Sequence, residues 1–344
     1  MASCTSSPTT FSDLQLHILQ THILPRLDGL SLSSAAATSS YLRSLSADHD
    51  LWAHICNSTW PSINHPCLHD VISTFPAAHR SFFHDSFPAA LITTIQGRIY
   101  VEPRFPSATF NHPDSSPHPL PSELISAIDI RYHNDVIFSR LEFTHTTPDF
   151  LSSTLRIVLN NSTARAGTSS KSIDLKISEL VDADDETIAE LKESMTLSWI
   201  VIDPTVKRAG NLSSIKPVLA WITNDTIHLR YVTVLPQNEL NEMVECRIEV
   251  ALAVGKGEVV SVNVSEVKLY IQDIACNCLS GKEFLVIMRR AILEKDRTRR
   301  KVVGDGDVVK LVGLKLEEDN QRVAYINLPL LSFLLLLYII LLLF

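Results

Sequence analysis

A long segment without charged residues ends the amino-acid sequence. Residues 323–344 contain no Asp, Glu, Lys or Arg. A helix of this length spans roughly 33 Å, against about 30 Å for the hydrocarbon core of a bilayer. A helix buried in a soluble domain is rarely apolar all round over such a length. The sequence therefore predicts a transmembrane helix over residues 323–344.

The other end of the chain shows no secretory signal peptide, because it has neither a basic start nor an apolar run. A C-terminal span without a signal peptide predicts a tail-anchored, single-pass membrane protein whose remaining residues face the cytosol. The lipid bilayer is then a partner, and the uncharged tip of the tail favours the endoplasmic reticulum. A signal for a glycosylphosphatidylinositol anchor is the alternative, and we disfavour it because it requires secretion.

Charge and motif content exclude several function classes. The net charge of −8 gives the chain no long-range attraction for nucleic acid. The six cysteines lack the paired spacing of zinc ligands, and Cys276 and Cys278 are too close together to form such a pair. Neither a nucleophile elbow nor a phosphate-binding loop is present. We therefore expect no catalytic residue, no metal site, no cofactor and no enzymatic activity.

Apolar residues near the N-terminus recur at helical spacing. Leu14, Ile18 and Ile23 follow a capping box that begins at Ser12, and Pro25 is expected to end this first helix. Further short helices are expected after Asp28, around the residues Tyr41, Leu42 and Leu45, and from Asp50 onward.

This region resembles the F-box, whose pattern is a Leu-Pro start, paired aliphatics, a Leu-Asp turn and a Leu-Trp pair after an acidic link. The chain departs from it at the start, where Phe11-Ser12 replaces Leu-Pro. Later segments extend the resemblance, over most of residues 11–290, to plant F-box proteins that include a cytokinin-induced member and some members with a hydrophobic C-terminal span. The matching segments are Ile23-Leu24, Leu27-Asp28, Leu51-Trp52, Trp60-Pro61-Ser62-Ile63, Arg80-Ser81-Phe82-Phe83, 197–205, 207–214 and Gly281-Lys282-Glu283.

The resemblance implies that residues 11–60 bind an Skp-type adaptor and, through it, a cullin–RING ubiquitin ligase. Helices this short bury little apolar surface by themselves, so a partner would complete their exposed aliphatic face. The alternative is that the same residues form only the core of a small helical domain. The predicted adaptor-binding residues are Phe11, Asp13, Leu14, Ile18, Leu27, Leu30, Leu32, Tyr41, Leu51 and Trp52.

Alternation of apolar and polar residues marks the middle of the chain. Ile128 and Ile130 alternate with polar residues before a turn at Asn134-Asp135, which predicts a hairpin. Two further hairpins are expected, with helices at 184–193 and 282–293. We expect target contacts at sheet edges and end loops. The further hairpins join 221–223 to 227–231 and 248–254 to 260–264, and the end loops include 204–214.

Together these patterns predict an α+β chain. Its parts are an N-terminal F-box of three to four helices, a mainly antiparallel, sandwich-like β domain with a few helices, and one C-terminal transmembrane helix. The predicted divisions are a disordered tail over 1–10, the F-box over 11–60, a helical extension over 61–99, a proline-rich loop over 100–122, a β-rich substrate-recognition domain over 123–295, a linker over 296–322 and the anchor over 323–344.

The favoured hypothesis is a non-catalytic substrate-recognition subunit of an Skp–cullin–F-box E3 ubiquitin ligase. Its C-terminal helix would hold it at a membrane, and its β domain would recruit an unknown, membrane-bound protein for ubiquitination. The alternative is a tail-anchored binding protein that senses glycan or lipid and acts outside ubiquitination.

Overall fold

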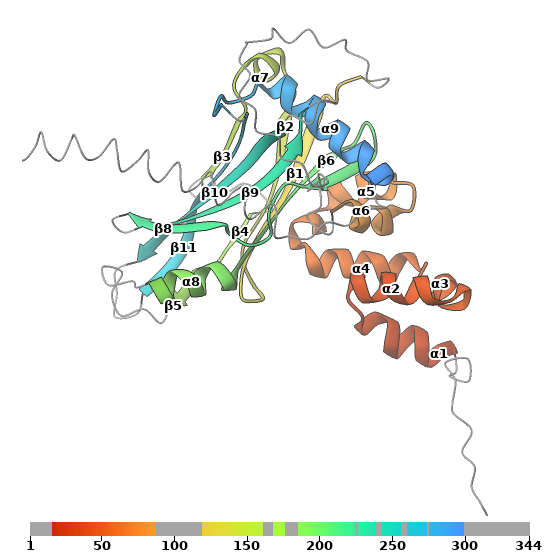
Figure 1. The fold of residues 1–344 in the computed structure, drawn as a ribbon. Helices are drawn as coiled ribbons and strands as arrows, with labels where there is room; N and C mark the ends of the chain where they lie inside the picture. The colour runs from red at the N-terminus through yellow and green to blue at the C-terminus, as the bar shows by residue number, and fades with distance from the viewer. Residues whose placement is uncertain are drawn as a thin grey trace, which may run out of the picture.

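The protein is described by a computed structural model with an N-terminal helical region followed by two antiparallel sheets (Figure 1). The predicted helices and antiparallel sheets are confirmed in this outline. The structure describes residues 16–86, 119–160, 168–175, 185–223, 226–237, 243–255, 260–273 and 275–298.

Short helices with polar N-caps build the helical region. Asp28, Ser39 and Asp48 each accept a backbone hydrogen bond at the start of a helix, and each such bond is worth about 1 kcal/mol. Regular bonding ends before Pro25, as predicted, and a 3-10 turn follows. The elements are α1 (Leu16–Ile18), the π-helical η2 (Leu19–Ile23), η3 (Leu24–Arg26), α2 (Gly29–Thr38), α3 (Ser40–Leu45), α4 (His49–Thr59), η4 (Pro61–Asn64), α5 (Pro66–Ser73) and α6 (Ala78–Ser86).

The strands form a five-stranded sheet in the order β4-β2-β1-β6-β7 and a six-stranded sheet that contains β3-β11-β10-β9-β8, with β5 also paired to β11. The three predicted hairpins are confirmed as β1/β2, β8/β9 and β10/β11. The strands are β1 (Glu123–Tyr132), β2 (Asp135–His145), β3 (Arg156–Asn160), β4 (Ser169–Ser170), β5 (Ile173–Leu175), β6 (Met195–Asp203), β7 (Arg208–Asn211), β8 (Leu219–Thr223), β9 (Thr226–Pro236), β10 (Met243–Gly255) and β11 (Val260–Gln272).

The five-stranded sheet is buried on both faces. Ile128 and Ile130 of β1 pack into the core between the sheets, whereas Ile125 and Ala127 pack with the N-terminal helices. This is the period-two geometry of a strand, in which successive side chains point to opposite faces. The six-stranded sheet contributes only one face to the core between the sheets.

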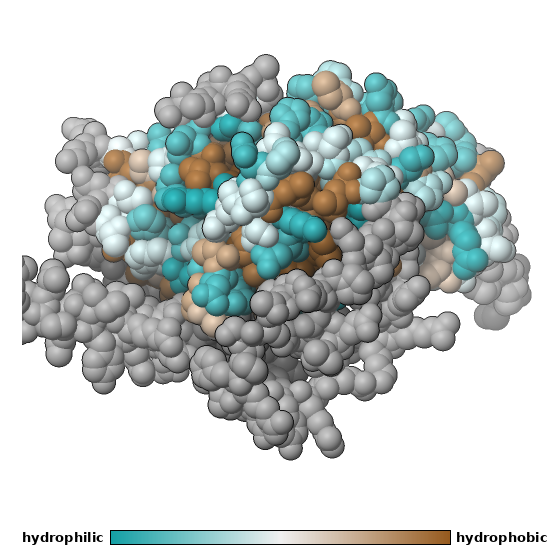
Figure 2. Space-filling view, turned by 90° about the horizontal axis from the view of Figure 1, so that it is seen from above, coloured by the Kyte–Doolittle hydropathy of each residue, from teal (hydrophilic) through white to brown (hydrophobic). Residues whose placement is uncertain are grey.

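Three further helices complete the body: α7 (Pro148–Ser152), α8 (Asp185–Ser194) and α9 (Gly281–Thr298). The last two confirm the predicted helices. Helix α9 begins with a capping box, since Ser280 N–H donates to Glu283 Oε2 at 2.7 Å. Its buried Arg289 contacts Asp203 Oδ2 at 2.7 Å. In the view from above, apolar side chains lie among hydrophilic ones over the described surface (Figure 2).

Polar contacts join the helical region to the five-stranded sheet. Arg208 of β7 donates to both carboxylate oxygens of Asp85 on α6, at 2.8 and 2.9 Å. Asp129 of β1 accepts hydrogen bonds from the Ser62 backbone and hydroxyl at 3.0 and 2.6 Å. These buried contacts fix the position of the helices on the sheet.

The prediction of a single-pass membrane protein, placed at the endoplasmic reticulum, is not supported and has to be corrected. None of the helices within the described residues is long and apolar enough to cross a bilayer. The segment that carried the prediction, 323–344, lies outside the described residues. Within the described residues, the fold is therefore a helical region followed by two antiparallel sheets, and it includes no transmembrane helix. The predicted tail 1–10 also lies outside the described residues, as do most of the loop 100–122 and of the linker 296–322.

Candidate partner-binding face

Large apolar side chains are exposed on the N-terminal helices. Leu16, Ile18, Leu30 and Tyr41 have exposed fractions of 48%, 37%, 52% and 42%. Only two other large hydrophobic residues among those described reach such exposure, so four of the six lie within the first 41 residues. Single exposed hydrophobic residues are ordinary, but four large ones within one helical region are candidates for contact with a partner. We call these four residues the apolar face.

The packing of α2 explains why Leu30 belongs to this face. Gly29, at the start of the helix, lies against the Phe83 ring, and a Cβ atom on Gly29 would approach Phe83 Cζ to 2.0 Å. Leu32 is fully buried in the core beneath the helix. Because the start of α2 is held in this orientation, the side chain of Leu30 lies on the exposed side.

The predicted adaptor-binding residues occupy three different environments. Ile18, Leu30 and Tyr41 are exposed, whereas Leu27 and Leu51 are partly buried against the helical core. Of the remaining predicted residues, two are buried and three lie outside the described part of the chain. Leu32 and Trp52 are buried, and Phe11, Asp13 and Leu14 lie outside the described residues.

Trp52 has an internal role. Its indole N–H donates to the Ser46 carbonyl at 2.6 Å, and its ring centroid lies 5.3 Å from that of Phe83. Leu32 and Trp52 therefore hold the helices together instead of facing a partner. The sequence pattern missed Leu16. The predicted face followed the four-residue step from Leu14 to Ile18, and Leu16 lies halfway along that step.

A pocket of about 300 Å³ lies between the first helical segment and α4. Its apolar lining comes from Leu24, Pro25, Leu45 and Leu51, and its polar lining from Gln20, Asp48, Asp50 and His54. Since these residues come from separate elements, no local sequence motif indicates the pocket.

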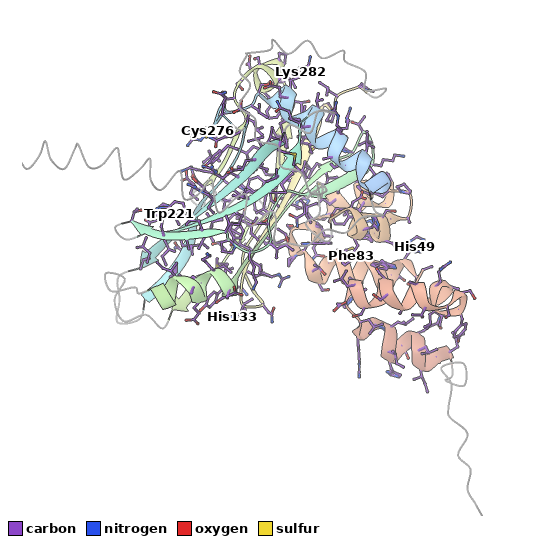
Figure 3. All side chains as sticks on the ribbon, viewed as in Figure 1. His49, Phe83, His133, Trp221, Cys276 and Lys282 are labelled. Carbon is purple, nitrogen blue, oxygen red and sulfur yellow. The ribbon has the colours of Figure 1, made fainter. Side chains whose placement is uncertain are left out.

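The six-stranded sheet presents a different kind of surface. Trp221 lies on β8 (Figure 3). Its ring stacks on His228 with centroids 5.1 Å apart, and the Arg230 guanidinium lies 5.1 Å from the Trp221 ring. Arg230 also pairs with Glu249 at 3.0 Å. Burial lowers the pKa of His228 from its ordinary value, which favours the neutral ring. Trp221, His228, Arg230 and Glu249 are each partly buried and define what we call the open face, a second candidate binding surface.

The predicted end loop 204–214 lies at the junction with the helices. Arg208 and Ala209 both donate hydrogen bonds to Asp85 on α6, and Leu212 and Ser213 are fully buried. Much of this segment is therefore used to hold the helical region to the sheet.

The described part of the chain shows no grouping of His, Cys, Asp and Glu that would hold a metal ion. Burial raises the pKa of the Cys56 thiol to about 12, so this thiol stays protonated near neutral pH. Its Sγ atom lies 3.3 Å from the His79 carbonyl oxygen, which places it in the helical core. Cys56 is thus a packing residue and not an activated nucleophile.

Three proteins of Arabidopsis thaliana are similar to this chain over most of its length. F-box protein At2g27310 is 35% identical over 294 residues, which cover 81% of this chain and 78% of the relative. F-box protein At3g44326 is 36% identical over 300 residues, which cover 82% of this chain and 74% of the relative. Probable F-box protein At2g36090 is 35% identical over 312 residues, which cover 88% of this chain and 83% of the relative.

These names identify F-box proteins and say nothing of a cytokinin response or of a membrane span. No protein-family model matches the chain. No solved structure matches it either.

Proposed function

The chain belongs to the plant F-box proteins, and from this membership we propose that it is the substrate-recognition subunit of an Skp–cullin–F-box ubiquitin ligase. In this proposal residues 11–60 form the F-box, which binds an Skp-type adaptor, and the adaptor connects it to a cullin–RING ligase. Residues 123–295 recruit the target protein. The chain itself selects and positions, while other subunits transfer ubiquitin.

The apolar face is the observation that carries the adaptor-binding role. Leu16, Leu30 and Tyr41 are each more than two-fifths exposed, although all three would be expected in a core. Burying a large apolar side chain contributes about 1.5–3 kcal/mol, which is a strong drive toward a partner. An adaptor that covers these residues, together with Ile18, would gain this energy on binding.

The junction between helices and sheet supports the positioning role. The buried Asp85–Arg208 pair and the Ser62–Asp129 hydrogen bonds join the two regions at separate points. Trp60 adds a third point, since its indole N–H donates to Ser198 Oγ on β6 at 3.3 Å. A target held by the sheets would therefore keep a defined orientation relative to the bound adaptor.

Co-purification of the full chain with an Skp-type adaptor and a cullin tests the proposal. The double variant Leu30→Ala and Tyr41→Ala should weaken adaptor affinity by about 100-fold, because two buried contacts of roughly 1.5 kcal/mol each are lost. Val158→Ala and Leu293→Ala are matched controls, since both residues are similarly exposed but lie in the β3 strand and the α9 helix. These controls should bind the adaptor as the wild type does.

Two results would contradict the proposal. Unchanged adaptor binding by the double variant would show that the apolar face is not the docking surface. Recovery of the adaptor without any cullin would place the protein outside the ubiquitin ligase.

A further inference from the structure

The pocket beside α4 combines an apolar interior with two carboxylates. Leu24 is nearly fully buried and Leu45 and Leu51 are partly buried, so they provide an aliphatic wall. Asp48 and Asp50 are exposed and lie at its rim. None of the described residues that line the pocket is Lys or Arg, and the basic side chain among them is the imidazole of His54.

One of these carboxylates has an acceptor atom to spare. Asp48 Oδ1 accepts the backbone N–H groups of Asp50 and Leu51 at 2.9 and 3.1 Å, as the N-cap of α4. A carboxylate has two oxygens that accept hydrogen bonds. The helix cap therefore leaves acceptor capacity on Asp48 for a donor that enters the pocket from outside.

The shape and charge of the pocket suit a long cationic side chain. Lys and Arg carry an apolar stem that packs on aliphatic surface and a charged head that pairs with carboxylates. A volume of about 300 Å³ is enough to hold such a side chain. A small neutral ligand would leave the two rim carboxylates without a complementary group.

The pocket also adjoins the apolar face. Leu16, Gln20 and Leu24 lie within one short segment, which runs from α1 through the π-helical η2 to the 3-10 turn η3. Leu16 belongs to the apolar face, while Gln20 and Leu24 line the pocket. A partner that extends along this segment from Leu16 would meet the pocket.

We propose that this pocket is a cation subsite of the adaptor interface, which receives a Lys or Arg side chain of the Skp-type adaptor between the aliphatic wall and the carboxylates of Asp48 and Asp50. The inference rests on the proposed function and adds an electrostatic contact to the apolar one. The occupant comes from the adaptor because every lining residue lies between positions 20 and 54, within the helical region.

The test measures binding of a recombinant Skp-type adaptor to the full chain by calorimetry at low and high salt. Asp48→Asn together with Asp50→Asn should weaken binding by about tenfold at low salt, because a partly buried charge pair is lost. Asn is as good an N-cap as Asp, so α4 keeps its start. The difference from the wild type should shrink at high salt, where exposed charges are screened.

Two further variants make the result specific. Asp70→Asn removes an exposed carboxylate on α5 that does not line the pocket, and it should bind as the wild type does. Gln20→Arg places a cation of the chain itself at the pocket wall, where it competes with the adaptor, and it should also weaken binding. In the Asp48→Asn and Asp50→Asn background the effect of Gln20→Arg should be smaller, since the carboxylates that hold its guanidinium are gone.

The outcomes separate the two proposals. Wild-type binding that is unchanged in the double Asn variant overturns the cation subsite and leaves the proposed function standing. A wild-type chain that fails to bind the adaptor overturns the proposed function and the subsite with it. A salt-sensitive loss confined to the pocket variants supports both.

Discussion

The outer faces of the two sheets differ in chemistry. On the five-stranded sheet, Ile125, Ile200 and Ile202 point away from the core between the sheets and pack under the N-terminal helices. On the six-stranded sheet, the corresponding positions include Arg230 and Glu249, which pair with one another at 3.0 Å. One face is apolar and covered by helices, whereas the other combines charged pairs with the small buried cluster of Val232 and Val234.

The difference shows how the chain separates its two proposed tasks. The covered face holds the helical region, on which Leu16 and Leu30 are exposed. The open face lies on the opposite side of the two-sheet body, with Trp221 at its edge strand, while Phe83 marks the junction with the helices (Figure 3). In the proposed function, adaptor and target would therefore bind to separate surfaces of the chain.

The largest effect is expected from two tryptophans on these opposite faces. Trp60→Ala should lower the free energy of unfolding by about 3–5 kcal/mol, since this buried ring packs on Phe82 and Phe83 with centroids 5.7 and 5.5 Å away. Trp221→Ala is the matched change on the open face and should cost about 1 kcal/mol or less. Urea unfolding of both variants measures the difference. Equal losses would show that the two faces are equally important for stability.

A second prediction compares two arginine–carboxylate pairs. Arg208→Ala should destabilise by about 3 kcal/mol, because it leaves the buried Asp85 carboxylate without its ion-pair partner. Arg230 is as buried as Arg208, but its partner Glu249 is 24% exposed against 4% for Asp85. Water can therefore replace part of the lost contact, and Arg230→Ala should cost less, about 1–2 kcal/mol. Chemical denaturation of each variant measures its loss of stability. Adaptor binding by each variant is the second measurement. A larger loss for Arg230→Ala would reverse the assignment of covered and open faces.

The comparison also explains what the sequence could predict. Alternation along β10 and β11 predicted a hairpin because one face is polar and the other apolar, as in Ile248 beside Glu249. In β6, Trp199 and Ile200 are adjacent and both fully buried, on opposite faces, so the sequence carries no sign of which face meets the helices. That choice depends on contacts between distant segments, such as Trp60 with Ser198.

The candidate site was predictable to the same limited extent. The F-box resemblance placed Leu30 and Tyr41 in the binding face, and both are exposed. It placed Leu32 there as well, although this residue is fully buried. Spacing on a helix identifies which residues share a side, but packing of Phe83 against Gly29 decides which side faces solvent.

Two acids of the covered face should give the protein opposite responses to pH. Burial raises the pKa of Asp85, but hydrogen bonds from His84 and Arg208 outweigh it and hold the pKa below its ordinary value. Its stabilising effect is present above the unfolded pKa of about 3.8 and is lost as pH falls through the lower folded pKa. Asp85→Asn should therefore show its largest deficit near neutral pH and a smaller one in acid, measured by urea unfolding.

Asp129 should behave in the opposite way. Burial raises its pKa above the ordinary value of 3.8, and the bonds from Ser62 and Ser139 only partly offset this. Because the folded state holds the proton more tightly, stability at this site is lost as pH rises from the unfolded pKa toward the raised folded pKa. Asp129→Asn should gain stability relative to the wild type over that rise. A parallel pH dependence for the two variants would contradict this account of the junction.

The last prediction concerns target recruitment by the open face. Arg230→Ala and Trp221→Ala combined should leave adaptor binding unchanged, because neither residue contacts the helical region or the pocket. If this face recruits the target, proximity labelling by the variant should lose a subset of the proteins labelled by the wild type. Leu293→Ala, at an exposed position on α9, is the control and should retain that subset. An unchanged set of labelled proteins in the double variant would move target recognition away from the six-stranded sheet, because no other change in the experiment alters the adaptor or the fold.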